Sequence, residues 1–204
     1  YKTDPVPEDL ILKILRAAQM GPSGSNRQPV EFLVVRDVEK RQKLKSLYLP
    51  VWAQYMSKME SGEWQVRGRE KLLKNADHYA QHMDEVPVQV VICFPLTDFR
   101  PIDSDLDRVS VVGGSSIYPV VQNLLLAARN EGLGTTLTTI HCVVEPDAKL
   151  VLEIPEDIGI AAIVSVGWPA KAFPKQLKRR PLAEISHADT YGQPLIDSDV
   201  EISL

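Results

Sequence analysis

Residues 21–29 combine the residue types that a ligand-binding loop needs. They include two glycines, two prolines and polar side chains at Ser23, Ser25, Asn26 and Gln28. Glycine lets a backbone approach a planar or phosphorylated ligand closely, and hydroxyl and amide groups can recognise the polar edge of a ring. The same composition is typical of a plain turn between a helix and a strand, so both interpretations stay open.

A basic cluster near the C-terminus could hold a phosphate. Five cations fall within ten residues of a chain that is acidic overall: Lys171, Lys175, Lys178, Arg179 and Arg180. A guanidinium can bind two phosphate oxygens at once, which favours Arg179 and Arg180. A solvated surface arm fits the composition equally well. A nucleic-acid surface is not expected, because interleaved aromatic residues and a basic domain are missing.

A threonine-rich segment could bind a ring nitrogen or a carbonyl group. Residues 132–139 read Gly-Leu-Gly-Thr-Thr-Leu-Thr-Thr. An edge strand rich in threonine is the alternative. The dinucleotide fingerprint G-x-G-x-x-G is incomplete, because Leu137 occupies the position of its last glycine. A nicotinamide site of the Rossmann type is therefore not expected.

Side chains for nucleophilic or metal chemistry are sparse. The loop departs from the nucleophile elbow G-x-S-x-G at Ser25, and it follows a helix instead of a strand. His78 and His82 are four residues apart, but Tyr79 stands where H-E-x-x-H requires glutamate. We expect no metal, and we expect an organic cofactor to carry any demanding chemistry.

The composition indicates one soluble globular domain. The chain has 204 residues, of which 44% are hydrophobic and 25% charged, and its net charge of −4 gives no reason to expect nucleic acid. Cys93 and Cys142 form no metal-binding or redox spacing, which fits a reducing compartment. No apolar run approaches the roughly 20 residues that span a bilayer, and no secretory signal opens the chain. A cytoplasmic location is expected.

Hydrophobic spacing predicts the elements that must position these residues. An apolar segment at 113–130 should form a buried helix, and Trp52, Tyr55, Met56 and Met59 recur at the spacing of a helix that faces a core or a subunit interface. One further predicted helix ends near residue 20. The others cover 37–48, 51–84 with a break near 61–62, and 145–154. The predicted strands are 30–35, 86–94, 135–140 and 159–167.

Four segments together resemble the nitroreductase family of flavin oxidoreductases. Residues 22–32, PSGSNRQPVEF, are similar to its P-S-x-x-N-x-Q-P-W-x-F stretch, with Val30 in place of the tryptophan. Residues 116–134 resemble its central helix and the following turn. Residues 166–169, VGWP, resemble its G-Y-P signature, and 177–182, LKRRPL, its K-R-x-P-L segment. The similarity is greatest to the branch that includes the iodotyrosine dehalogenases.

This resemblance implies an α+β fold with a central mixed sheet flanked by helices and an extended C-terminal arm over about residues 170–204. It implies a homodimer with FMN at the subunit interface, NADH or NADPH as electron donor, and a small-molecule acceptor such as a nitroaromatic or a quinone. The loop would lie along the flavin, the threonine-rich segment would lie near its N5 and carbonyl edge, and the arginines would hold its phosphate. The residues so implied are Pro22, Ser23, Gly24, Asn26, Gln28, Leu137, Thr138, Thr139, Arg179 and Arg180.

Other functions remain open. Reductive dehalogenation of a phenolic substrate would need a lid from residues 45–85 that grips a zwitterion, with Glu60, Glu63 and Lys74 as candidates. A protein that binds flavin without turnover is a second alternative. A purely structural or partner-binding domain is a third.

Overall fold

The computed structural model describes residues 1–63, 70–98, 101–174, 177 and 179–196. The chain divides into two compact units, Tyr1–Lys171 and Ala172–Leu204, and each is described by itself. The expectation of a single domain stays a prediction.

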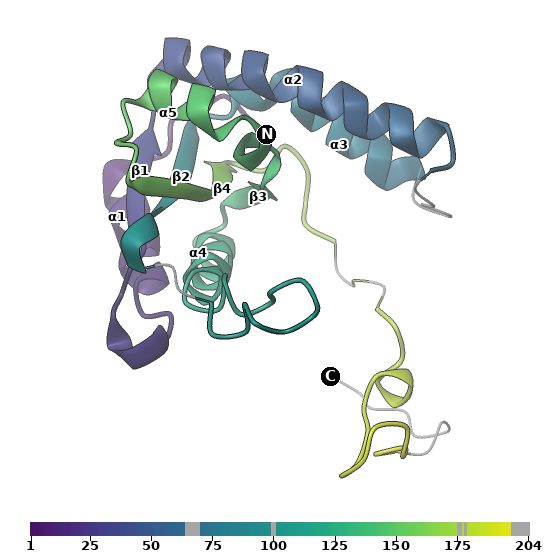
Figure 1. Ribbon diagram of the computed structural model, residues 1–204. Coiled ribbons are helices and arrows are strands. Elements are labelled where there is room, and N and C mark those ends of the chain that lie inside the picture. The colour runs from purple at the N-terminus through teal and green to yellow at the C-terminus, as the bar shows by residue number, and fades with distance from the viewer. Residues whose placement is uncertain (64–69, 99–100, 175–176, 178, 197–204) are drawn as a thin grey trace. The chain divides into compact units, whose positions relative to one another are not determined.

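A four-stranded sheet forms the centre of the first unit (Figure 1). Its order is β1-β2-β4-β3, and all three pairs are antiparallel, so the expected mixture of strand directions is not seen among the described strands. The α+β class is confirmed. The strands are β1 (Glu31–Val35), β2 (Val88–Pro95), β3 (Gly134–Thr138) and β4 (Ile158–Gly167).

Helices cover both faces of this sheet. Strand β2 is buried on both sides, because Val90 and Ile92 point to one face and Val91 points to the other. The first face packs on α1 (Glu8–Ala18) and α4 (Tyr118–Asn130). The second packs on α2 (Val38–Glu60) and α5 (Glu145–Leu152). Antiparallel strands with two covered faces explain why β2 and β4 read as nearly continuous apolar runs.

Helix α2 is longer than the sequence predicted. We expected two helices, ending near residue 48 and starting at 51, but one helix runs through Pro50 to Glu60. Proline removes the hydrogen bond to the carbonyl of Ser46. Because Ser46 lies on the exposed side of the helix, water can satisfy that carbonyl, and the interruption is tolerated.

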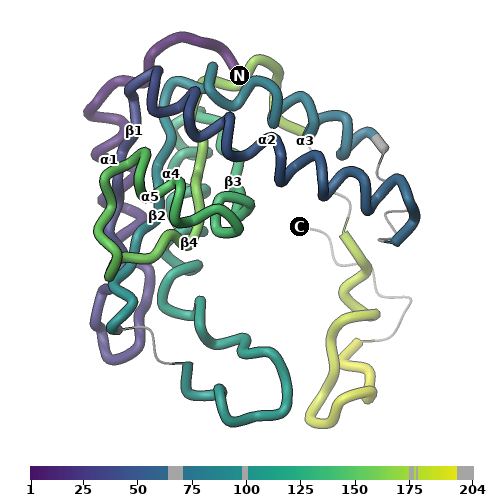
Figure 2. The backbone as a smooth tube through the Cα atoms, turned by 45° about the horizontal axis from the view of Figure 1, so that its top comes forward, coloured from purple at the N-terminus to yellow at the C-terminus, as the bar shows by residue number. Residues whose placement is uncertain are grey.

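Helices α2 and α3 (Glu70–His82) lie side by side (Figures 1 and 2). The predicted stripe is confirmed as core in part. Trp52 is buried and packs with Tyr48, Ala80 and Met83, and Tyr55 and Met56 are partly buried against this cluster, whereas Met59 does not belong to it. The Trp52 indole also donates a hydrogen bond to the Asp77 carboxylate at 2.9 Å. The predicted break near residues 61–62 matches the end of α2.

Helix α4 is less completely buried than predicted. It begins at Tyr118, after a run of turns over residues 113–117, and its inner face is buried at Val120, Val121, Leu124 and Ala128. Leu126 on another face remains 58% exposed and lines a groove of about 480 Å³ between α1 and α4. Apolar residues on most of the circumference therefore do not correspond to full burial within one chain.

The second unit is short and irregular. It contains a 3-10 turn at Leu182–Glu184 and an isolated antiparallel bridge between His187 and Pro194. None of the described helices combines the length and the apolar composition that a bilayer-spanning helix requires.

Candidate functional site

The loop between α1 and β1 has an unusual backbone. Ser25, Asn26 and Gln28 have φ values of 53°, 53° and 52°, in the left-handed region that glycine normally occupies. Arg27, between them, is right-handed with φ −70°. Three such residues within four positions indicate a conformation that the surroundings impose, and such strain is concentrated at functional sites.

Two serines hold this loop in place. Ser23 Oγ accepts a hydrogen bond from the Gln28 N–H at 2.9 Å, which closes the loop on itself. Ser116 Oγ, just before α4, accepts one from the Gly24 N–H, also at 2.9 Å. The structure thus brings Ser23, Gly24 and Gln28 together. Sequence reasoning assigned no role to Ser116, which lies 92 residues from its partner.

Gly21 allows the loop to approach α4 closely. A Cβ atom at this position would lie 2.7 Å from the Val120 backbone nitrogen and 2.8 Å from its Cα. These distances are too short for any side chain, so the start of the loop packs directly against the helix backbone.

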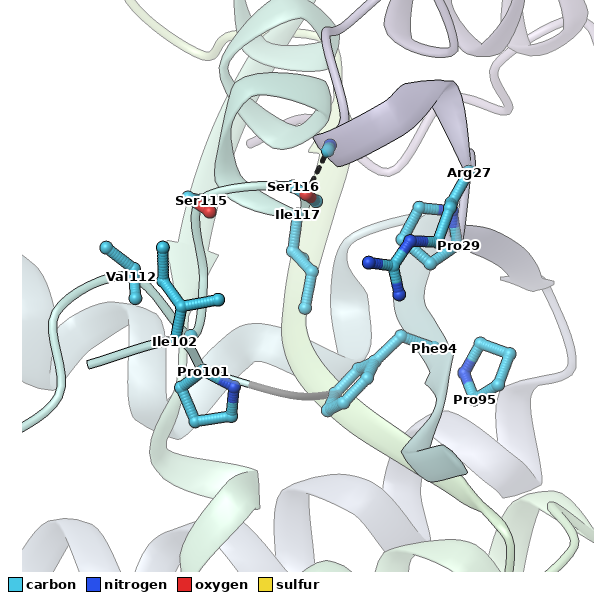
Figure 3. A pocket seen from close by; sticks show the side chains of 12 residues that line it. Arg27, Pro29, Phe94, Pro95, Pro101, Ile102, Val112, Ser115, Ser116 and Ile117 are labelled. Carbon is cyan, nitrogen blue, oxygen red and sulfur yellow. Dashed lines mark hydrogen bonds between the residues drawn. The ribbon is translucent and has the colours of Figure 1, made fainter. Parts of the chain in front are cut away.

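Two cavities flank the loop. One of about 180 Å³ is lined by Ser23, Gln28 and Ser116, among others. The other, of about 230 Å³, lies between Gly24 and the segment that precedes α4, and Figure 3 shows the side chains around it. Of the predicted loop residues, Ser23, Gly24 and Gln28 therefore line concave surface. Pro22 and Asn26 belong to the same loop and are exposed.

The second predicted group lies at the end of β3. Leu137 is 41% exposed, Thr139 is exposed, and the Thr138 hydroxyl is buried 3.5 Å from that of Tyr48 on α2. Strand β3 is at the edge of the sheet, so its outer backbone groups have no strand partner among the described residues. This group contacts α2, whereas the loop contacts α4, so the two predicted groups lie at separate places in one chain.

A third cavity adjoins β3 and was not predicted from the sequence. It measures about 340 Å³ and is lined by Tyr1, Asn75, His78, Tyr79 and Thr136, among others. The hydroxyls of Tyr1 and Thr136 are hydrogen-bonded at 2.6 Å, and those of Tyr79 and Ser165 at 2.8 Å. Burial raises the pKa of Tyr1 to about 12 and that of Tyr79 still further, so both phenols are neutral hydrogen-bonding groups. No sequence pattern links residues so far apart.

The predicted phosphate-binding arginines lie in the second unit. Arg179 and Arg180 are exposed, and Arg180 forms an ion pair with Glu184 at 3.2 Å. Lys175 and Lys178 of the basic cluster lie outside the described residues. Phosphate binding by Arg179 and Arg180 stays a prediction.

The lid candidates lie around the end of α2 and on α3. Glu60 and Lys74 are exposed, whereas Glu63 pairs with Lys58 at 3.4 Å. On α3 the rings of His78 and His82 lie 4.2 Å apart, and His82 Nδ1 is hydrogen-bonded to the His78 carbonyl. In the part of the chain that the structure describes, no three ligand-type side chains converge on a point that could hold a metal.

His141 should make stability depend on pH. It is buried against Tyr48, and its Nε2 is hydrogen-bonded to the Leu44 carbonyl at 3.0 Å. Burial lowers the pKa of His141 from 6.5 to about 4. Between these values the unfolded chain binds more protons, so the free energy of unfolding should fall by roughly 3 kcal/mol as the pH drops from 6.5 to 4.

Urea unfolding of the wild type, His141→Phe and His78→Gln across this pH range tests the expectation. His141→Phe should flatten the profile, whereas replacement of the exposed His78 should leave it unchanged. Equal slopes in all three proteins would contradict a role for His141.

Comparisons with known proteins place the chain in a family. A model described as "Nitroreductase family" matches residues 1–168. A protein of Methanothermobacter thermautotrophicus named "Putative NADH dehydrogenase/NAD(P)H nitroreductase" is 25% identical over 173 residues, which cover 84% of this chain and 71% of that protein. Human iodotyrosine deiodinase 1 is 28% identical over 183 residues. That match covers 88% of this chain but 61% of the human protein, so the chain spans less than two thirds of this relative.

The solved structures confirm the fold. A crystal structure of oxidized iodotyrosine deiodinase bound to FMN and 3-iodo-L-tyrosine aligns with a TM-score of 0.66 at 21% identity. The alignment covers 89% of each chain. Identity at this level supports the fold alone.

Proposed function

The chain belongs to the nitroreductase family, and on that premise we propose that it is an FMN-dependent oxidoreductase that uses NADH or NADPH to reduce nitroaromatic, quinone or related acceptors. The observation that carries the proposal is the strained loop pinned by Ser23 and Ser116 beside two cavities. A small, rigid, polar loop is what a planar cofactor needs for close approach.

The residues present fit FMN. At Gly24 an added Cβ would meet only the Ser116 hydroxyl, at 3.6 Å, so the backbone there is open to a ligand. The free edge of β3 offers backbone amides and carbonyls near Leu137–Thr139 to the polar edge of a flavin. Arg179 and Arg180 would supply charge for its phosphate.

A homodimer would bring the loop and the end of β3 together as the two halves of one site. We propose that the loop of one copy faces the end of β3 of the other, with the groove along Leu126 covered at the interface. Exposed apolar side chains on α1, just after it and on α4 support this arrangement, since Leu12, Met20 and Leu126 are each more than half exposed in one chain.

FMN, when held by the loop, would supply the two-electron chemistry by which a quinone, NAD(P)H and one proton yield a hydroquinone and NAD(P)⁺. The chain's part is to stack the reactants, orient them and exclude water. This division of labour requires no side-chain nucleophile, which agrees with the scarcity of catalytic groups in the sequence.

An absorbance spectrum tests the proposal. Purified protein should be yellow or become so with added FMN, and NADH or NADPH should bleach it without oxygen. A quinone or nitroaromatic should then restore the colour. Protein that stays colourless with saturating FMN, or whose bound flavin is not reduced, would overturn the proposal.

Reductive dehalogenation is the second candidate, because several relatives are named for iodotyrosine. Two electrons and a proton would convert the aryl halide to an arene and a halide ion. Against it, Glu63 of the expected lid is already paired with Lys58. Halide release from a halotyrosine by the reduced protein distinguishes the two activities.

A further inference from the structure

Arg27 directs a cation into the cavity beside the loop. Figure 3 shows its guanidinium pointing inward, near the Phe94 ring and Ile117. The backbone on either side is fixed, because the Arg27 N–H is bonded to the Gly24 carbonyl at 3.2 Å and the next N–H is bonded to Ser23. The side chain is therefore presented from a rigid support.

Among the described residues, none of those that line the cavity supplies a counter-charge to this cation. No ion pair or side-chain hydrogen bond joins Arg27 to another residue within the described ranges, and none of the 12 residues that line the cavity is acidic. The other walls are mainly apolar, formed by rings and branched side chains such as Phe94, Ile102 and Val112. Arg27 itself is exposed and Ile102 is 92% exposed, so the cavity is open to solvent. A guanidinium at its mouth favours an anionic partner, because it can donate two charge-assisted hydrogen bonds to one carboxylate.

One acidic residue next to the cavity lining already has its hydrogen bonds made within its own turn. Asp103 follows the lining residue Ile102, but its carboxylate accepts hydrogen bonds from Arg108 at 2.7 Å, Ser110 at 2.6 Å and the Val111 N–H at 3.0 Å. These bonds lower the pKa of Asp103 well below its usual range. They hold the turn that carries Ile102 and Val112, so Asp103 builds the cavity wall and its own charge is already compensated.

We propose that this cavity selects an acceptor that carries a carboxylate on an apolar, planar body, and that Arg27 is the specificity-determining residue that binds the carboxylate. The proposal rests on the proposed function, because Gly24 belongs both to the cavity wall and to the loop assigned to the flavin. At about 230 Å³ the cavity is smaller than the roughly 300–1,000 Å³ of drug-sized sites, so it suits a substituted single ring.

Binding of 4-nitrobenzoate and of neutral 4-nitrobenzyl alcohol tests this directly. Calorimetric titration of the full chain, with and without saturating FMN, needs no turnover. The wild type should bind the acid at least tenfold more tightly than the alcohol. Arg27→Gln should weaken binding of the acid by 10- to 100-fold and change binding of the alcohol by less than twofold, while Arg27→Lys should retain part of the preference.

Arg16→Gln is the matched control, because Arg16 is an exposed arginine in the last turn of α1 and does not line the cavity. It removes the same charge and should leave both affinities unchanged. Equal affinity of the wild type for acid and alcohol, or an equal loss of both in Arg27→Gln, would overturn the proposal. Selective acid binding in protein that never takes up FMN would support the Arg27 site while refuting the flavin function.

Discussion

Gly21→Ala should lower the free energy of unfolding by about 1–3 kcal/mol and weaken FMN binding at least tenfold. The new methyl group would lie 2.7 Å from the Val120 backbone nitrogen, which belongs to a buried helix and cannot move aside locally. The loop must therefore shift away from α4, which would break the bond between Gly24 and Ser116. Urea unfolding of the FMN-free protein and titration with FMN measure the two effects.

Gly24→Ala is the matched control in the same loop. Its added Cβ would meet the Ser116 hydroxyl at 3.6 Å, an ordinary contact, so stability should change by less than about 0.5 kcal/mol. If Gly21→Ala is as stable as the wild type and binds FMN normally, the loop is not held by contact with α4.

Leu126→Glu should convert the proposed homodimer into monomers. The substitution would place a carboxylate of each copy in an apolar interface, where its desolvation should raise the dimer dissociation constant at least 100-fold. FMN affinity should fall as the dimer is lost, because the two halves of the site then no longer meet. The monomer should stay folded, since Leu126 is 58% exposed in the single chain.

Leu150→Glu makes the same change on α5, across the sheet, where Leu150 is 79% exposed. It should leave both assembly and FMN affinity unchanged. Sedimentation equilibrium measures the assembly of both variants, and FMN titration measures their affinity for FMN. A wild type that is monomeric at micromolar concentration and still binds FMN would contradict the dimer.

The spacing of hydrophobic residues along the chain was sufficient to predict most helices and strands of the first unit. The β-branched run at residues 88–92 and the apolar spacing from Val120 to Ala128 correspond to β2 and α4 because burial determines both patterns. The predicted gap between the helices at 37–48 and 51–84 was wrong, because α2 runs through Pro50. A proline in the sequence predicts an interrupted helix, but the sequence does not show that the carbonyl left without its hydrogen bond is exposed to water.

The candidate site was only partly predictable. The small and polar residues at 21–29 identified the loop, because a loop is determined largely by its own residue types. Ser116 and the cavity around Tyr1, Asn75 and Tyr79 were missed, because these contacts join residues that are tens of positions apart and leave no periodic trace. Arg27 lies within the predicted loop, but its place beside described lining residues of which none is acidic is a property of the fold.

The left-handed residues of the loop have a consequence for how this protein can evolve. Ser25 and Gln28 occupy backbone conformations that glycine adopts without steric cost, so a lineage selected only for heat resistance would gain by accepting glycine at either position. The same exchange would release the loop to sample other shapes and would reduce its readiness for a ligand. Selection for thermal stability and selection for rapid ligand binding therefore favour different residues at these two positions.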